Sequence, residues 1–239
     1  MRGFRALIVW GLVLACPARA QDEDDWVVHA VALSPDLSNA AFGHMYEDRG
    51  GSFLHLRQDG KDRWKIDAPS PLRSMAFSAD GNLLATATDR GEVILWDAAT
   101  GERSFVFNVE KGWGLAVAIS PDGRRVACGG QGRTVQVFDR VTRNESWKGK
   151  FERGIGCIAF SPDGAWLAVS EWQGPVHLLD AKTVEAKGSL ESGGNATALC
   201  FSADGKRLAV GDRTGGVSLW DVGGMKRLFD CMGHEKSVS

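Results

Sequence analysis

The sequence lacks an excess of charge of either sign, a long apolar run, and any stretch of helical periodicity after residue 20. Its 28 Lys+Arg and 30 Asp+Glu give a net charge of −2. A chain without excess positive charge lacks the electrostatic signature of a protein that binds nucleic acid. The hydrophobic share of 44% is still ample for a buried core. We therefore expect one large or two small globular domains that do not bind nucleic acid.

The motifs of common catalytic and cofactor sites are also missing. The chain has no Gly-x-Ser-x-Gly elbow and no phosphate loop ending in Gly-Lys-Ser/Thr. None of the five His residues has the spacing to His, Cys or a carboxylate that a metal site requires. The acidic stretch 22–25 lacks the Gly hinge and distal Glu of a calcium loop. We expect no catalytic residues, no bound metal and no cofactor.

Cysteine is sparse, and no Cys-x-x-Cys motif occurs. Cys128, Cys157 and Cys200 fall in apolar segments, where the default role is that of a small buried hydrophobe. Since disulfides form in exported proteins, a bridge between Cys128 and Cys157 is a second hypothesis.

The first twenty residues have the pattern of an export signal. Arg2 and Arg5 precede the apolar run ALIVWGLVLA at 6–15, and Ala-Arg-Ala at 18–20 supplies small residues for cleavage. The run is too short to span a bilayer, which needs roughly 20 apolar residues. The sequence therefore predicts a signal peptide at 1–20, an acidic tail at 21–25 and no integral membrane span in the mature chain.

The predicted location is periplasmic or extracellular. A lipoprotein signal, with the lipid on Cys16, is a weaker alternative because Leu14 stands where a smaller residue is usual.

Glycine, by contrast, is abundant: 30 of 239 residues, or about twice the average share of roughly 7%. It accompanies a repeated phrase, Ser-Pro-Asp or Ser-Ala-Asp, which recurs at intervals of 44, 42, 41 and 41 residues from Ser34 to Ser202. A second phrase, an apolar pair followed by Asp, recurs at 42, 41 and 41 residues from Leu95 to Leu219. Two independent markers with one period of this length indicate a repeat architecture.

Each unit contains four short apolar runs separated by turn signals. In residues 155–190 the runs begin at Ile155, Trp166, Val176 and Val184. The Ser-Pro-Asp-Gly phrase is typical of a tight turn, because Pro fixes φ, Asp caps the backbone and Gly supplies a positive φ. Short runs with a turn every eight to twelve residues favour an all-β meander. Such four-stranded units stacked around an axis form a β-propeller.

At this point the chain resembles the WD-repeat β-propellers. The resemblance rests on phrases such as FSADGNLLATATDRGEVILWDAATG at 77–101 and FSADGKRLAVGDRTGGVSLWD at 201–221, and it covers residues 26–234. It implies five blades of four antiparallel strands, at about 26–68, 73–110, 114–151, 155–191 and 196–232. The residues that carry the repeat are Asp80, Trp96, Asp97, Asp122, Asp139, Asp163, Asp180, Asp204, Trp220 and Asp221.

The buried polar network of the family, which joins a His, a Ser or Thr, a turn Asp and the Trp of Trp-Asp, is mostly missing. Phe138 and Leu179 replace two of the Trp residues. The turn Asp is replaced by Arg90, Gly132, Gln173 and Thr214. We therefore expect apolar packing between blades to stabilise the fold.

The resemblance also implies that Gly233-His234 is the lead-in to a sixth blade, because a Gly-His pair precedes the first strand of a unit in this family. Members usually close with seven blades. We expect residues 233–239 to be this lead-in and the chain to be a partial propeller, which blades of a longer chain would complete. A closed ring of five blades is the alternative.

One face of the predicted propeller, made by the loops into each first strand and the turns between second and third strands, is the candidate protein-binding face. Its Trp and Arg residues are typical of binding hot spots, although Trp113 and Trp172 could instead cover the interfaces between blades. The candidate residues are Arg90, Lys111, Trp113, Arg133, Arg153, Trp172, Gln173 and Arg213.

The predicted function is a non-catalytic scaffold that binds other proteins or envelope components. The alternative is a substrate-binding or regulatory propeller of a larger enzyme or sensor. First strands such as 155–160 offer Gly, Ala, Ile and Cys rather than His, Asp and Arg, which favours the scaffold.

Overall fold

The computed structural model of the chain describes residues 26–46, 52–109, 116–192 and 195–232. Every regular element in this part is a β-strand, and the strands form five sheets of four consecutive antiparallel strands. The predicted all-β fold is confirmed. None of these residues belongs to a helix that could cross a membrane. The predicted signal peptide, acidic tail and lead-in lie outside the described residues.

Each sheet is one blade, and its strands are numbered from the innermost to the outermost. Blade I contains β1 (Trp26–Leu33), β2 (Asn39–Tyr46), β3 (Ser52–Gln58) and β4 (Lys61–Ala68). Blade II contains β5 (Leu72–Phe77), β6 (Leu83–Thr88), β7 (Glu92–Asp97) and β8 (Arg103–Asn108).

The other three blades follow the same order. Blade III contains β9 (Ala116–Ile119), β10 (Arg125–Gly129), β11 (Thr134–Asp139) and β12 (Asn144–Lys150). Blade IV contains β13 (Ile155–Phe160), β14 (Trp166–Glu171), β15 (Val176–Asp180) and β16 (Ala186–Leu190). Blade V contains β17 (Ala196–Phe201), β18 (Arg207–Asp212), β19 (Gly216–Asp221) and β20 (Lys226–Met232).

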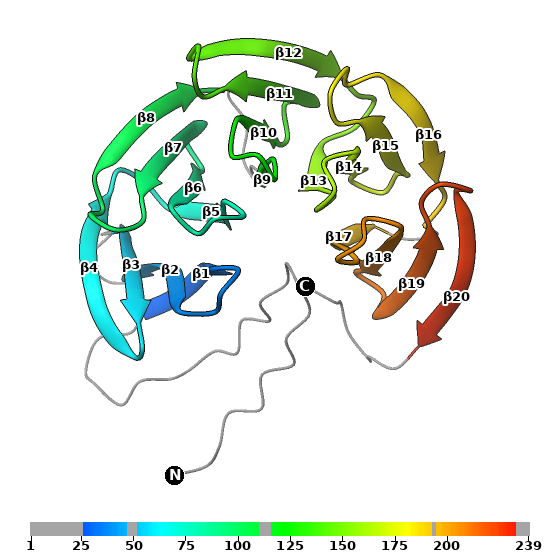
Figure 1. Cartoon of the computed structure of the whole chain (residues 1–239). Coiled ribbons are helices and arrows are strands. Elements are labelled where there is room, and N and C mark those ends of the chain that lie inside the picture. Colours follow the sequence, from blue (N-terminus) through cyan, green and yellow to red (C-terminus); the bar gives the residue numbers. More distant parts are fainter. Residues whose placement is uncertain (1–25, 47–51, 110–115, 193–194, 233–239) are drawn as a thin grey trace.

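The five blades lie side by side along an arc, with blades I and V at its two ends (Figure 1). The innermost strand of each blade faces the axis and the outermost strand forms the rim. The molecule is therefore an open, partial β-propeller, and the closed five-blade ring considered from the sequence is not formed.

In the part of the chain that the structure describes, the core consists of four apolar clusters, each between two consecutive blades. Blades I and II enclose Leu54, Leu84 and Trp96, which have no solvent exposure. Blades III and IV enclose Ile155 and Leu167, which are also fully buried. Because a single sheet is too thin to bury its own faces, each blade depends on its neighbours for its core.

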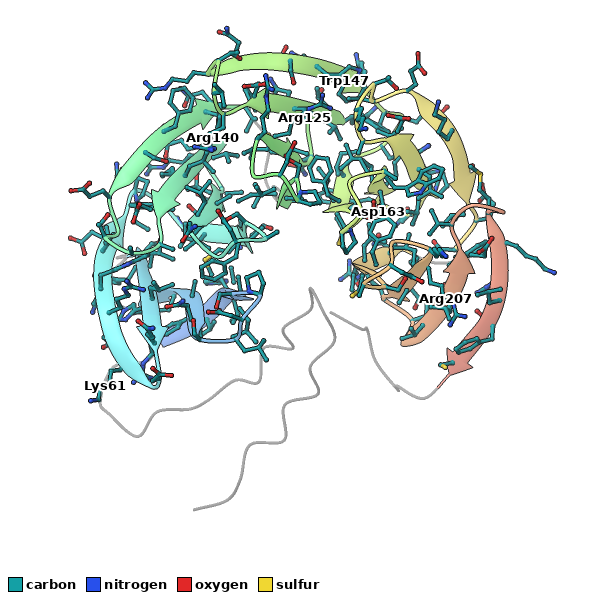
Figure 2. All side chains as sticks on the ribbon, in the orientation of Figure 1. Lys61, Arg125, Arg140, Trp147, Asp163 and Arg207 are labelled. Carbon is teal, nitrogen blue, oxygen red and sulfur yellow. The ribbon has the colours of Figure 1, made fainter. Side chains whose placement is uncertain are left out.

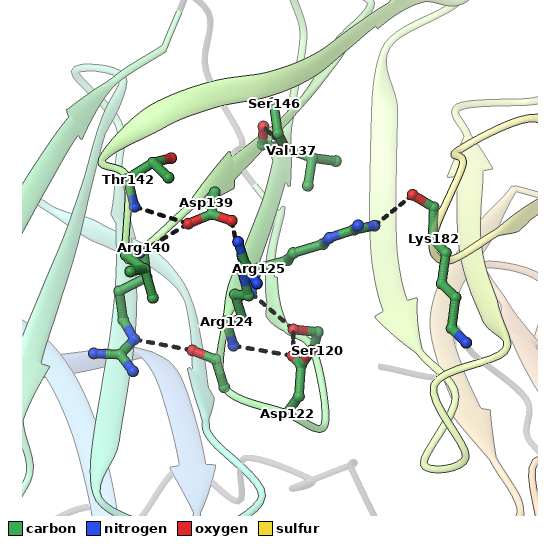
Figure 3. Close-up of polar contacts among 12 residues, drawn as sticks. Ser120, Asp122, Arg124, Arg125, Val137, Asp139, Arg140, Thr142, Ser146 and Lys182 are labelled. Carbon is green, nitrogen blue, oxygen red and sulfur yellow. Dashed lines mark hydrogen bonds and ion pairs between the residues drawn. The ribbon is translucent and has the colours of Figure 1, made fainter.

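The repeated Ser-x-Asp phrase forms the same turn in all five blades. In blade III the Ser120 hydroxyl donates to Asp122 Oδ1 at 2.5 Å and accepts the Arg125 N–H at 2.8 Å, while Asp122 Oδ1 accepts the Arg124 N–H at 3.0 Å (Figure 3). The following Gly123 has φ 67°. In blade I the same position is Leu37, with φ 62°. The turn is therefore set by side chains within one blade.

A polar contact also joins blades III and IV. The Arg125 guanidinium donates from Nη1 to the carbonyl oxygens of Ala181 and Lys182, at 2.6 and 2.7 Å. Figure 3 shows this side chain reaching from the start of β10 to the turn of the next blade. Arg125 is separated in sequence from Ala181 by 56 positions and from Lys182 by 57 positions.

Part of the polar network that we expected to be missing is present. The Trp96 indole Nε1 donates to the Thr86 hydroxyl at 2.9 Å, and both side chains are fully buried. In blade V the Trp220 Nε1 donates instead to Ser218, in the same strand. The family pair of Trp and Thr is therefore intact in blade II, at one of the two Trp residues that match the family, while apolar clusters fill the interfaces between blades.

Candidate functional site

A pocket of about 720 Å³ lies where blades III, IV and V meet, beside the innermost strands β13 and β17. We call it the inner pocket. It is formed by the turns between second and third strands and by the loops that enter first strands, as the sequence predicts for the candidate face. Its lining residues are Gln131, Arg133, Glu152, Arg153, Gly154, Gly156, Trp172, Gln173, Asn195, Ala196, Thr197 and Arg213.

Five of the eight predicted face residues line this pocket: Arg133, Arg153, Trp172, Gln173 and Arg213. Arg90 is exposed in the turn between β6 and β7 of blade II and does not line it. Lys111 and Trp113 lie outside the described residues. The structure thus brings together the members of the candidate face that come from blades III to V.

The turns of the inner pocket are held by hydrogen bonds across blades. The Arg153 guanidinium donates from Nη1 to the carbonyl of Gln173 at 2.7 Å. The Gln173 N–H donates to Asn195 Oδ1 at 3.3 Å, and the Arg213 N–H donates to the Asn195 carbonyl at 3.1 Å. Loops of three blades are therefore tied to one another around the pocket.

Positive charge dominates this pocket. Among the described residues that line it, three are arginines, Arg133, Arg153 and Arg213, and one, Glu152, carries a carboxylate. Arg133 and Arg213 are exposed, and neither forms an ion pair with any residue of the described part of the chain. Guanidinium groups bind carboxylates in bidentate geometry and stack on aromatic rings, so the pocket is suited to an anionic group.

Trp172 both fills space and lines the pocket. Its ring lies over the backbone at Gly154 and Gly156, so closely that a Cβ on Gly154 would come within 2.9 Å of the ring. The glycines are therefore needed for this ring position. The side chain is half-buried, and its remaining surface is open to the pocket.

The repeated carboxylates serve as backbone caps. In the first set, the hydrogen bond from Ser78 lowers the pKa of Asp80, and those from Ser34 and Ser38 lower the pKa of Asp36 to about 2. In the second set, Asp97, Asp139 and Asp180 each accept two backbone N–H groups of the following turn. Among the described residues, no group of three or more His, Cys, Asp or Glu could hold a metal ion.

The cysteines do not form the bridge considered from the sequence, since Cys128, Cys157, Cys200 and Cys231 are all free thiols. Cys128 is buried in β10, and burial raises its pKa. The Cys157 thiol donates to the carbonyl of Thr197 in the next blade at 2.8 Å. Burial raises the pKa of Cys157 to about 11, so these thiols are poor nucleophiles.

Sequence reasoning missed a charged group on the innermost strands of blades I and II. His29 and Arg73 occupy irregularities in β1 and β5, where the pairing register shifts by one residue. Arg73 Nη2 lies 3.7 Å from Asp89 Oδ2. Burial, and then the charge of Arg73, lower the pKa of His29. His29 and Arg73 lie together because each occupies a β-bulge. The alternation of apolar and polar residues does not reveal where a strand has a bulge.

Two family models match the chain. One, described as outer membrane protein assembly factor BamB, matches residues 54–171, from within β3 to the end of β14. The other, the WD domain, G-beta repeat, matches residues 186–221, from the start of β16 to the end of β19. The first match runs from blade I into blade IV and the second from blade IV into blade V, and both agree with the five four-stranded antiparallel blades.

Proposed function

We propose that this chain, which belongs to the WD-type propeller family, is a non-catalytic scaffold that binds another protein in the cell envelope or outside the cell. The observation that carries the proposal is the inner pocket. There, three guanidinium groups and one Trp from separate loops gather over an area where three blades meet. A partner segment with an acidic group beside an apolar side chain fits this combination.

The comparisons support a binding role. Propeller families of the WD and BamB-like kinds generally mediate protein interactions and are generally non-catalytic. The family matched at 54–171 carries the description of an outer membrane protein assembly factor. Together with the predicted signal peptide at 1–20, this description supports an envelope location.

Site-specific crosslinking in the organism that encodes the chain tests this proposal. A photoreactive residue in place of Gln173, which is exposed beside the pocket, should give one defined crosslinked protein. Arg133→Glu should abolish that product because it reverses a charge at the pocket. Arg140→Glu is the matched control, since Arg133 and Arg140 flank β11 at opposite ends. Equal loss with both variants, or no defined product, would contradict the scaffold.

A second candidate function is a propeller that binds a small polar substrate or signal for a larger enzyme or sensor. It is favoured by a group made of His29 and Arg73 on the innermost strands β1 and β5 and of Asp89 in the turn after β6. Under this alternative, Arg73→Ala would remove ligand binding while the crosslink at Gln173 is unaffected.

A further inference from the structure

A second hollow, which we call the rim groove, lies between the outer strand β12 of blade III and strands β15 and β16 of blade IV, with a volume of about 880 Å³. Trp147, on β12, marks its position near the rim (Figure 2). Its apolar lining consists of Trp147, Phe151, Pro175, Leu179, Val184 and Ala186. The rim groove shares Glu152, Arg153 and Gln173 with the inner pocket, so the two hollows are adjacent.

A buried carboxylate lines this groove. The Glu171 side chain is 3% exposed. Its Oε1 accepts the N–H groups of Glu152 at 2.9 Å and of Arg153 at 3.4 Å. Within the described part of the chain, its Oε2 accepts no hydrogen bond. Glu171 thus fixes the loop between β12 and β13 with one oxygen and leaves the other available.

No lysine or arginine of the described residues pairs with Glu171. The nearest guanidinium on the loop, that of Arg153, donates instead to the carbonyl of Gln173. Among the residues that the structure describes, the basic group within 4 Å is His177, whose Nε2 lies 3.6 Å from Oε1 and has no hydrogen-bond partner there. A buried carboxylate is costly unless a cation accompanies it. The groove therefore has room for a cation at Glu171, a place that His177 fills only when it is protonated and that no Lys or Arg of the described residues fills, although Lys150 and Arg153 also line the groove.

The walls fit the remainder of a basic side chain. Trp147 and Phe151 present aromatic surface, and the Phe151 ring centroid lies 5.2 Å from that of His177. Long basic side chains pack their methylene stems on such apolar surface, and a guanidinium is attracted to an aromatic face. Arginine is favoured over lysine because its guanidinium is less strongly hydrated and can donate two parallel hydrogen bonds to a carboxylate.

We propose that the rim groove binds one arginine side chain of the partner, with the guanidinium on Glu171 and the stem against Trp147 and Phe151. The proposal rests on the scaffold function and specifies the partner. The partner segment carries an acidic group that lies in the inner pocket and an arginine that lies in the rim groove, on either side of Arg153. The basic inner pocket and the buried Glu171 carboxylate set the orientation of the segment, as complementary charges do at protein interfaces.

The test uses the full chain and small probes, so that it is independent of the partner. N-acetyl-arginine amide should shift the indole NMR signal of Trp147, assigned by its loss in Trp147→Phe, and should saturate at millimolar concentration. N-acetyl-citrulline amide, which has the same shape but no charge, should bind about tenfold more weakly or not at all. N-acetyl-lysine amide should bind less tightly than the arginine probe.

Two matched variants locate the binding. Glu171→Gln should weaken the arginine probe about tenfold, whereas Glu191→Gln, which removes an exposed carboxylate of the same groove, should leave it unchanged. Should Glu171→Gln lower the melting temperature through its loop contacts, Trp147→Ala provides a second reading and should weaken the probe several-fold.

Equal binding of the arginine and citrulline probes, or arginine binding that survives both Glu171→Gln and Trp147→Ala, overturns the proposal. If the arginine probe binds but Gln173 gives no crosslink, the arginine site in the rim groove is supported and the proposed scaffold function is contradicted. If Gln173 gives a defined crosslink but the arginine probe does not bind, the scaffold function is supported and the arginine site is contradicted.

Discussion

Blades II and V present the same face of the repeat in two different environments. Val93 and Leu95 of blade II pack against blade III and have no solvent exposure. Their counterparts in blade V, Val217 and Leu219, are only half-buried at the end of the arc.

The outermost strands show the same difference. Phe105 of blade II is half-buried, with its ring centroid 4.5 Å from that of Phe107. Phe229, which occupies the equivalent position in blade V, is 53% exposed. The side chains and strands of the two blades are alike. Blade II has a following blade packed against it, and in the described part of the chain blade V does not. In this protein the local sequence determines the strand, and the neighbouring blade determines the burial.

The largest effect expected from this difference concerns the buried Leu of the third strand. Leu95→Ala should lower the free energy of unfolding by about 2–5 kcal/mol, because it leaves a cavity in a packed interface. Leu219→Ala should cost less than half as much, since its side chain already contacts solvent. Urea unfolding of both variants measures the two losses, and equal losses would show that burial in blade II does not depend on blade III.

An intermediate effect is expected at the fifth position after the turn Ser. Arg125 and Arg207 occupy this position in blades III and V (Figure 2), but only Arg125 reaches a following blade, where it donates two hydrogen bonds. Arg125→Ala should cost about 1–3 kcal/mol, and Arg207→Ala about 0.5 kcal/mol or less. Thermal melting compares them, and a larger loss at Arg207 would refute the role of the contact between blades.

The acid response should not distinguish the two blades, because the turns are internal to each blade. The hydrogen bonds from Ser78 and Ser202 lower the pKa of Asp80 and of Asp204, respectively. A lowered folded-state pKa contributes stability that is present above the unfolded value of about 3.9 and is lost as the pH falls below it.

Asp80→Asn and Asp204→Asn should therefore each flatten the fall in stability below about pH 4, and by similar amounts. Urea unfolding between pH 5 and pH 2.5 provides the measurement. Flattening in the blade II variant alone would mean that the turn depends on its neighbours.

The smallest effect is a gain. Leu37 takes the positive φ that Gly occupies in the other four Ser-x-Asp turns, and it is 51% exposed. A left-handed conformation costs a residue with a Cβ about 1–2 kcal/mol, part of which the greater backbone freedom of Gly offsets. Leu37→Gly should therefore raise the unfolding free energy by about 1 kcal/mol or less. A loss of stability would show that Leu37 makes a packing contribution at this end of the arc.

Much of the fold could be predicted because its signals are local. All the hydrogen bonds of the Ser-x-Asp turn lie between Ser120 and Arg125. The alternation of apolar and polar residues within one strand identifies the two faces of that strand. The grouping of Arg133, Trp172 and Arg213 also followed from the repeat, because equivalent turns of neighbouring blades must lie near one another.

The rest depends on contacts between distant residues. Two features require the register of neighbouring strands and the direction of each side chain. They are the Arg125 contact with Ala181 and the position of the buried Glu171 carboxylate against the loop at Glu152 and Arg153. Neither is encoded in a window of sequence. The Cys128–Cys157 hypothesis was wrong for the same reason, since apolar context located both thiols in strands but could not orient them toward each other.

The four apolar clusters, each confined to two consecutive blades, have a consequence for how such chains can change in evolution. A duplication or deletion of one complete unit alters two interfaces at most and leaves every other cluster intact. An insertion of an odd number of residues within a strand shifts the alternation and exposes an entire face. Length variation among relatives should therefore occur in steps of about one repeat, or within the turns.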